Sequence, residues 1–235
     1  MAPSSEREAI NSLICQWQEA IEFFSNRRRH ERERVVARAF LRAVGESYVE
    51  GEFVVGPSEP IDVSYREARF QIMELPGERG RLDEFRERLR RARLAKRLID
   101  VGEPWSSSKP MSLAEAVRAV AIQLEPKSRK YGAVGCAELD ALVYINIPGR
   151  HLHPELEEAS VEDHGLKQQG WRSVSVLAPP YGFVAFASAQ APDLLKNKAG
   201  KVLQCAGPDV ALVNVRRISE TFALDGCRIT LNLAP

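Results

Sequence analysis

The apolar residues of this 235-residue chain change their spacing along the sequence, and this change of period limits which folds the chain can adopt. Spacings of three and four residues, typical of amphipathic helices, fill two N-terminal stretches and return in two central ones. Runs rich in Val, Ile, Phe or Tyr and bounded by Gly, Pro or Ser, typical of strands, lie between these helix pairs and after them. The expected helices are residues 5–24, 28–44, 82–99 and 112–124, and the expected strands are 47–55, 61–65, 68–75, 139–147, 173–177 and 182–187.

This order of elements predicts the fold class. Three consecutive strands indicate a meander, so the sheet is not of the doubly wound parallel kind. We expect an α/β fold in which a mixed β-sheet is flanked by helices. Two further strand-like runs, 210–215 and 227–233, predict a C-terminal β-hairpin. The expected division is a domain of residues 1–200, including the N-terminal helix, and a C-terminal extension of residues 201–235 packed on it.

Composition and charge exclude several classes of protein. Lys and Arg number 33 against 32 Asp and Glu, so global charge gives no argument for a nucleic-acid or membrane partner. The four cysteines form no CxxC pair, which favours a reducing, cytoplasmic location. Residues 1–10 are polar and acidic, so we expect no secretory signal there, and no apolar run approaches the ~20 residues of a membrane span. The sequence also lacks a phosphate-binding glycine loop, a GxSxG elbow and an HExxH helix.

Acidic residues stand at two positions where the apolar pattern predicts burial. Glu33 lies on the helical face of Val36 and Phe40, and Asp62 lies within an apolar strand. A buried carboxylate is costly unless it meets a partner, a metal or water. Two carboxylates brought together from a helix and a strand could hold Mg²⁺ or Mn²⁺ through oxygen ligands. The alternative is that each acid pairs with one of the many arginines of the chain.

The order of a helix-borne Glu, a Pro-x-Asp strand and a paired site on the next strand resembles the PD-(D/E)XK nuclease superfamily. Several stretches between residues 17 and 200 are also similar to a bacterial family of unknown function described as "putative endonucleases". These stretches are Phe24-Ser25-Asn26, His30–Arg34, Pro60–Val63, Glu138–Asp140 and Gly170–Ser173. The resemblance implies a restriction-endonuclease-like core in domain 1–200. It also implies Mg²⁺-dependent hydrolysis of phosphodiester bonds, with Glu33 and Asp62 as metal ligands.

Two positions depart from the superfamily pattern. Where the superfamily has an acid and a lysine, this chain has Gln71 and Met73, which share one face of a strand. Gln71 can offer a metal a neutral carbonyl oxygen or position a water, whereas Met73 supplies no charge. Lys96, on the following helix, is a candidate for the substitute cation. The resemblance therefore implies a degenerate catalytic set of Glu33, Asp62, Gln71 and Lys96.

A row of arginines lies along one side of the helix predicted over residues 82–99. Residues 78–97 hold nine basic and four acidic side chains, a local surplus of five positive charges. Because guanidinium groups match phosphate geometry, this surplus predicts binding of nucleic acid, DNA more than RNA. The alternative is a solvated face balanced by neighbouring glutamates. The candidate phosphate contacts are Arg86, Arg90, Arg93, Arg97 and Arg172.

Three hypotheses of function follow from these features. The first is a nucleic-acid-binding, Mg²⁺-dependent endonuclease with a degenerate active site. The second is a catalytically inactive nuclease-fold module that binds nucleic acid without divalent metal. The third is an assembly subunit, such as a homodimer, that pairs strands through its C-terminal hairpin.

Overall fold

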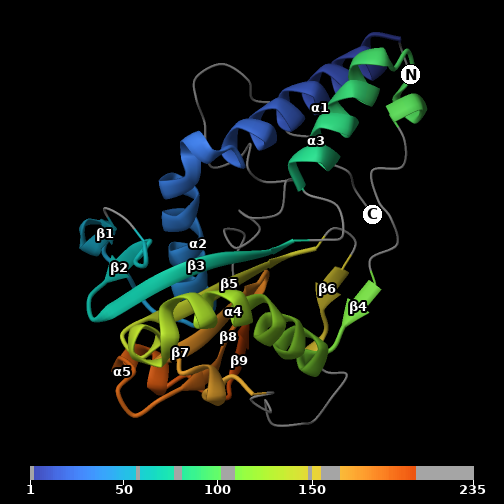
Figure 1. Ribbon diagram of the computed structural model, residues 1–235. Helices are drawn as coiled ribbons and strands as arrows, with labels where there is room; N and C mark the ends of the chain where they lie inside the picture. Colours follow the sequence, from blue (N-terminus) through green and yellow to red (C-terminus); the bar gives the residue numbers. More distant parts are fainter. Residues whose placement is uncertain are drawn as a thin grey trace. The chain divides into compact units, whose positions relative to one another are not determined.

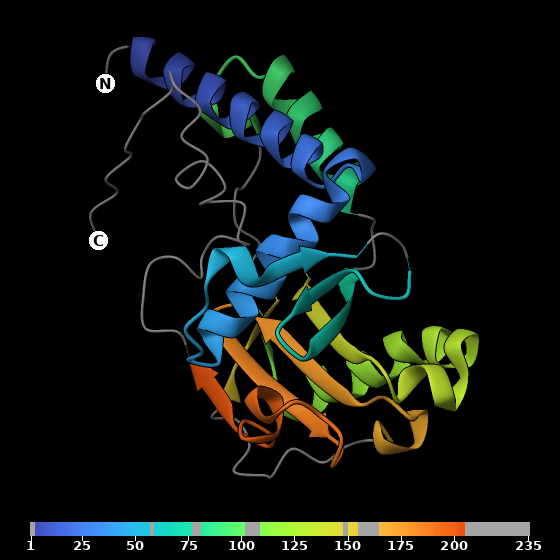
Figure 2. The ribbon, with the colours of Figure 1, turned by 90° about the vertical axis from the view of Figure 1, so that its left-hand side faces the viewer.

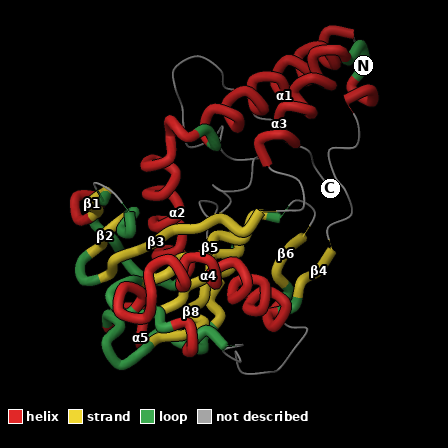
Figure 3. Tube along the Cα trace, in the orientation of Figure 1, coloured by secondary structure: helices red, strands yellow, loops and turns green. Residues whose placement is uncertain are grey.

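The computed structural model describes residues 3–56, 59–76, 81–101, 109–147, 150–154 and 165–204, which fall into two compact units. The helical unit takes the described parts of residues 1–29 and 79–106. The sheet unit takes those of 30–78 and 107–210. Figure 1 labels the elements, and Figure 3 separates helices from strands by colour.

Seven strands form one mixed sheet in the sheet unit, in the order β1-β2-β3-β5-β7-β8-β9. The central strands β3, β5 and β7 are parallel neighbours, and the flanking strands pair antiparallel. The strands are β1 (Phe53–Val55), β2 (Val63–Tyr65), β3 (Ala68–Pro76), β5 (Asp140–Asn146), β7 (Ser173–Ala178), β8 (Tyr181–Ala187) and β9 (Val202–Gln204), while β4 (Lys109–Met111) and β6 (Arg150–Leu152) form a separate parallel pair. The prediction of a mixed sheet flanked by helices is confirmed.

Helix α2 (Arg29–Ala43) covers one face of this sheet. The ring of its Phe40 lies 6.1 Å from that of Phe70 on β3. Near the end of the helix, Ala43 lies so close to Gly182 of β8 that a Cβ on the glycine would stand 2.7 Å from the Cβ of Ala43. The absence of a side chain at Gly182 therefore lets the helix cross the sheet at short range.

Helix α4 (Leu113–Cys136) covers the other face, and Figures 1 and 2 show the sheet between α2 and α4. Its Val120 and Leu124 belong to one buried cluster with Met73 of β3, Val143 of β5 and Val176 of β7. Since side chains alternate across a strand, the odd-numbered residues of β3 and β5 face α4.

Helix α4 is longer than the sequence pattern indicates. The prediction of an end near Leu124 is wrong, because the helix runs through Pro126 to Cys136. A break in the helical dihedral angles comes only at Gly132, where φ is 67°. The N-terminal boundary follows the prediction, since Ser112 and Glu115 form a capping box that satisfies the first amide groups.

The helical unit pairs α1 (Pro3–Phe23) with α3 (Arg81–Leu94) through aromatic side chains. The ring of Phe85 on α3 lies 5.7 Å from that of Trp17 and 5.5 Å from that of Phe24. Helix α3 ends at Leu94 and a 3₁₀ turn follows over Leu98–Val101, so the predicted helix over 82–99 is interrupted. None of the helices in the described part of the chain combines the length and apolar character of a membrane span.

Two short elements complete the described residues of the sheet unit, α5 (Asp193–Lys196) and β9 at the sheet edge. The strands predicted over 210–215 and 227–233 lie outside the described residues. The C-terminal hairpin and the division at residue 200 therefore stay predictions.

The starts of the three parallel strands meet at Asp140, which is fully buried. Its carboxylate accepts hydrogen bonds from the amide of Arg69 on β3 at 2.9 Å and from the hydroxyl of Ser173 on β7 at 2.7 Å. Arg172 completes the cluster as an ion pair, with its Nε 3.1 Å from the carboxylate and its Nη2 also in contact. The Nη2 group also donates to the carbonyl of Glu67 at 2.9 Å.

Substitution Asp140→Asn should lower the free energy of unfolding by about 3–5 kcal/mol, because it leaves the largely buried Arg172 guanidinium without a counter-charge. Urea unfolding followed by circular dichroism measures the change. Glu138→Gln is the matched control. It removes the solvent-exposed pair with Arg69, so the expected loss is below about 1 kcal/mol. Equal losses in the two variants would contradict the role assigned to Asp140.

Candidate functional site

Asp62 and Gln71, two of the residues expected in the site, are in contact. Asp62 lies in the bend before β2, and its carboxylate accepts hydrogen bonds from the amide of Ile72 at 2.7 Å and from Nε2 of Gln71. Both side chains are buried, with 4% and 1% of their surface exposed. The bend is held by the main chain, since Asp62 donates to the carbonyl of Phe70 and accepts from the amide of Gly56, each at 2.9 Å.

The other end of the Gln71 amide reaches α4. The hydroxyl of Tyr131 donates to Oε1 of Gln71 at 2.6 Å, and Nζ of Lys127 donates to the oxygen of Tyr131 at 3.1 Å. Lys127 also donates to Glu59 at 2.8 Å. A continuous row of side chains therefore leads from the buried carboxylate of Asp62 to charged groups at the surface. We call Asp62, Gln71 and Tyr131 the Asp62 network.

Sequence patterns gave no indication of Tyr131 or Lys127 in this site. Both follow Pro126 and lie beyond residue 124, where the apolar spacing predicts the end of the helix. Their spacing of four residues could have identified them as neighbours on one helical face. Nothing in the sequence links them to Gln71, which lies 60 positions before Tyr131.

The charges at the outer end of the row remain ionised. Hydrogen bonds from Lys127 and Lys130 lower the pKa of Glu59 from 4.5 to about 2. Burial acts to lower the pKa of Lys127, but hydrogen bonds to Glu59 and Tyr131 outweigh it and raise the pKa above its ordinary value. The ammonium–carboxylate pair is thus fully charged near neutral pH.

Glu33 belongs to the other side of the sheet. It is 5% exposed and lies two turns before Phe40 on α2, the helix that contacts Phe70. Its Oε2 lies 3.4 Å from Nδ1 of His30. Since Phe70 and Gln71 point to opposite faces of β3, Glu33 and the Asp62–Gln71 pair approach the sheet from opposite faces.

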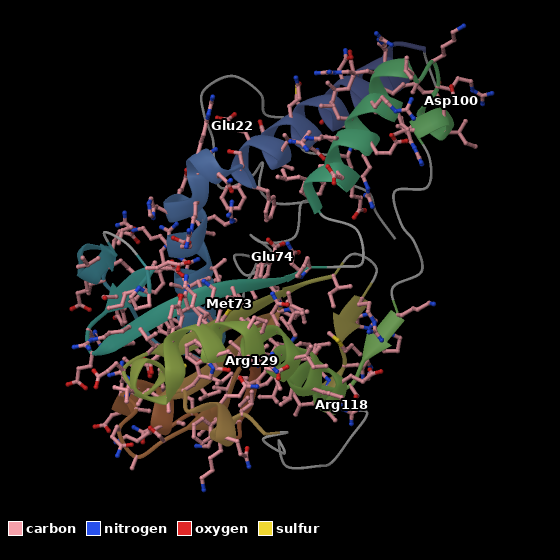
Figure 4. All side chains as sticks on the ribbon, viewed as in Figure 1. Glu22, Met73, Glu74, Asp100, Arg118 and Arg129 are labelled. Atoms are coloured by element: carbon pink, nitrogen blue, oxygen red, sulfur yellow. The ribbon has the colours of Figure 1, made fainter. Side chains whose placement is uncertain are left out.

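Glu74 is the acid of β3 that shares a strand face with Phe70. Its Oε1 accepts a hydrogen bond from Nδ2 of Asn146 on β5 at 2.8 Å. Figure 4 shows Glu74 next to Met73 on β3, and strand alternation turns their side chains to opposite faces. Met73 is buried in the cluster under α4, so this position contributes packing and no charge.

The residues around Asp62 do not fit a magnesium ion. Oδ2 of Asp62 accepts the hydrogen bonds from both Gln71 and Ile72, and the one oxygen of the Gln71 amide accepts from Tyr131. No three His, Cys, Asp or Glu side chains are grouped for metal binding among the residues that the structure describes. A hard cation needs several free oxygen ligands, which this arrangement does not offer.

The predicted phosphate contacts lie in both units. Arg86 pairs with Asp83 at 3.1 Å, and Arg90 pairs with Glu87 at 2.8 Å. Arg93 is exposed, and no ion-pair partner for it lies within the described residues. Arg172 in the sheet unit is bound to Asp140.

Lys96 and Arg97 follow the end of α3 and are therefore not on the helical face predicted for the arginine row. The amides of both residues donate to the Asp100 carboxylate, at 3.2 and 2.9 Å. Lys96 lines a shallow depression of about 300 Å³ together with Arg91, Leu94, Ala95 and Asp100. The side chain of Arg97 is exposed and, like that of Arg93, has no ion-pair partner within the described residues.

The fold and the site define an α/β protein with a mixed sheet between two helices, in which a buried carboxylate and amide are hydrogen-bonded to a half-buried phenol. Over residues 5–208 the chain matches the model of a family described as "Putative endonuclease, protein of unknown function (DUF1780)". The chain belongs to this family, which confirms the family resemblance noted in the sequence.

A solved structure supports the fold. It is described as a protein of unknown function from Pseudomonas aeruginosa strain PAO1, of the monooxygenase superfamily. The similarity has a TM-score of 0.61 at 24% sequence identity, and it covers 87% of this chain and 98% of that one. At this identity the two proteins share a fold, and no activity follows from the likeness. No curated protein matches the chain.

Substitution Gln71→Met should lower the free energy of unfolding by about 3 kcal/mol, since it removes the amide between a buried carboxylate and a phenol. Tyr131→Phe removes the hydrogen bond that the phenol donates to Gln71 and the one that it accepts from Lys127, and it should cost about 1–2 kcal/mol because Lys127 keeps Glu59 as a partner. Urea unfolding of both variants provides the comparison. A larger loss for Tyr131→Phe than for Gln71→Met would contradict the central place of Gln71 in the Asp62 network.

Proposed function

We propose that this protein binds nucleic acid through its arginine-rich helix α3, and that the Asp62 network has a structural role in place of a metal centre. The observation that carries the proposal is the charge of α3. Its Arg81–Leu94 segment has six arginines against three acids. Asp83, Glu84 and Glu87 are each paired with arginines of the same helix. A surplus of positive charge remains in the helix.

Arg93 on α3 and Arg97, three residues past its end, carry positive charge that no acid among the described residues neutralises. Both are exposed, which leaves their guanidinium groups accessible to a phosphate backbone. Each phosphate that such a group neutralises releases counterions, so affinity depends on salt. The family description as a "putative endonuclease" supports a nucleic-acid partner for this surface.

The order of elements supports a relation to the PD-(D/E)XK superfamily. Helix α2 carries Glu33, the bend before β2 carries Asp62, and β3 carries Gln71 and Met73. This is the order implied by the resemblance, with the acid and lysine positions replaced. Hydrogen bonding at Asp62 and Gln71 favours a nuclease-like scaffold that binds without cleaving.

The double substitution Arg93→Gln, Arg97→Gln should weaken binding to duplex DNA and reduce the slope of log K against log salt by about 1.8, the value for two lost phosphate contacts. Fluorescence anisotropy over a series of salt concentrations measures the slope. Arg118→Gln on α4 is the control, because it removes one exposed arginine of the sheet unit and should leave the slope nearly unchanged. Unchanged binding in the double variant would overturn the proposal, and parallel titrations with RNA establish the preference for DNA.

Metal-dependent hydrolysis by Glu33 and Asp62 stays a prediction with its own test. In the non-catalytic role, EDTA leaves DNA binding unchanged and Mg²⁺ or Mn²⁺ produces no cleavage of plasmid or single strands. Cleavage that is present in the wild type and absent in Asp62→Asn would establish the catalytic alternative. Asp62→Asn is chosen because it keeps the shape of the side chain in its hydrogen-bonded bend.

A further inference from the structure

Two lysines on one side of α4 bind a single carboxylate. Nζ of Lys127 lies 2.8 Å from Oε1 of Glu59, and Nζ of Lys130 contacts Oε2 of the same group. Both ammonium groups also lie over the ring of Tyr131, at 5.5 and 5.4 Å from its centre. We call Lys127, Lys130 and Tyr131 the lysine cluster.

The Asp62 network positions the lysine cluster through Tyr131, which belongs to both groups. The Tyr131 hydroxyl donates to Gln71, so its oxygen is free to accept from Lys127. The Tyr131 ring also packs edge to face on Trp171, at 6.3 Å between centres. The position of Lys127 is therefore set by buried groups, and not by Glu59 alone.

The two ammonium groups of the lysine cluster favour an anion between them. The side chain of Lys127 is only 27% exposed, so its ammonium group has lost part of its hydration. The side chains of Lys130 and Glu59 are 57% and 35% exposed, which leaves the outer side of the cluster open to solvent. Two donors that each hold one oxygen of a carboxylate can equally hold two oxygens of a phosphate group.

We propose that Lys127 and Lys130 form a phosphate-binding site, and that Glu59 occupies this site as an internal ligand until a phosphate group displaces it. Glu59 acts as a competitor tethered to the site, so its effective concentration is high and the affinity of the intact protein for phosphate is reduced. The site lies in the sheet unit, and it does not depend on binding of nucleic acid by α3.

The test uses Glu59→Gln, which removes the competing charge and keeps the size of the side chain. Thermal unfolding is followed as inorganic phosphate replaces chloride at constant ionic strength, because a ligand that binds the folded state raises the unfolding temperature. We expect Glu59→Gln to bind phosphate at least tenfold more tightly than the wild type. Adding Lys130→Gln, at the more exposed lysine, should abolish the gain.

Glu125→Gln is the matched control, because Glu125 pairs with Arg129 on the same helix outside the lysine cluster. It should leave the response to phosphate unchanged. A second titration uses a thymidine oligonucleotide with no terminal phosphate. A gain for the oligonucleotide identifies a phosphodiester site, and a gain for inorganic phosphate alone identifies a site for free phosphate or a monoester.

Two results would overturn the proposal. One is Glu59→Gln binding neither probe more tightly than the wild type, which would make Glu59 a structural partner of the lysines only. The other is an equal gain in Glu125→Gln, which would reduce the effect to a general change of surface charge. Neither result bears on the proposed binding of nucleic acid by Arg93 and Arg97, since both arginines are intact in all of these variants.

Discussion

The buried carboxylate of Asp140 sets the register of the central sheet. It lies at the start of β5 and accepts from the amide of Arg69 on β3 and from the hydroxyl of Ser173 on β7. A buried carboxylate is tolerated only when charge and hydrogen bonds compensate it, and Arg172 supplies the charge. Because a slip of one residue would separate these partners, the three parallel strands have one favourable alignment. The helices on both faces depend on that alignment for the side chains they cover.

The Asp62 network also compensates a buried carboxylate, here with hydrogen bonds from an amide side chain and a main-chain amide. Gln71 is an amide with a donor at one end and an acceptor at the other, and it lies between a carboxylate and a phenol. Hydrogen bonds at both ends of a buried amide hold the side chain in one orientation, whereas an amide end without a partner would be costly. An acid at position 71 would repel Asp62 and could attract a cation. In this structure the glutamine joins Asp62 to Tyr131 and so links β3 to α4.

The sequence predicted the mixed sheet and its flanking helices because alternating and helical apolar spacing survive in the buried faces of β3, α2 and α4. It predicted burial of Glu33 and Asp62, since an acid inside an apolar pattern is visible without a structure. It failed at Pro126, where a helix was expected to stop. Proline lacks the amide donor that the helix would use at this position. The helix tolerates this loss because it packs again into the buried cluster after Pro126, at Cys136.

The partners of the buried acids could not be predicted in the same way. Strand alternation separates Gln71 from Phe70, but only the three-dimensional structure shows that α2 covers Phe70 while α4 reaches Gln71. The contact between Gln71 and Tyr131 joins distant parts of the chain and leaves no periodic trace. Local patterns therefore indicated which residues are unusual, and the tertiary fold decided what each of them meets.

The path of the chain between β3 and β5 affects how the protein is made. These strands are neighbours in the sheet, yet α3 and α4 both lie between them in sequence. On the ribosome, α1 emerges long before its partner α3, and the completed meander β1-β2-β3 must wait with one edge uncovered until β5 follows. Until α3 follows, the partner of Trp17 and the partner strand of β3 are both still to be made. Synthesis of this chain thus passes through a stage in which both units are half-built, and neither can close without a segment that has yet to be translated.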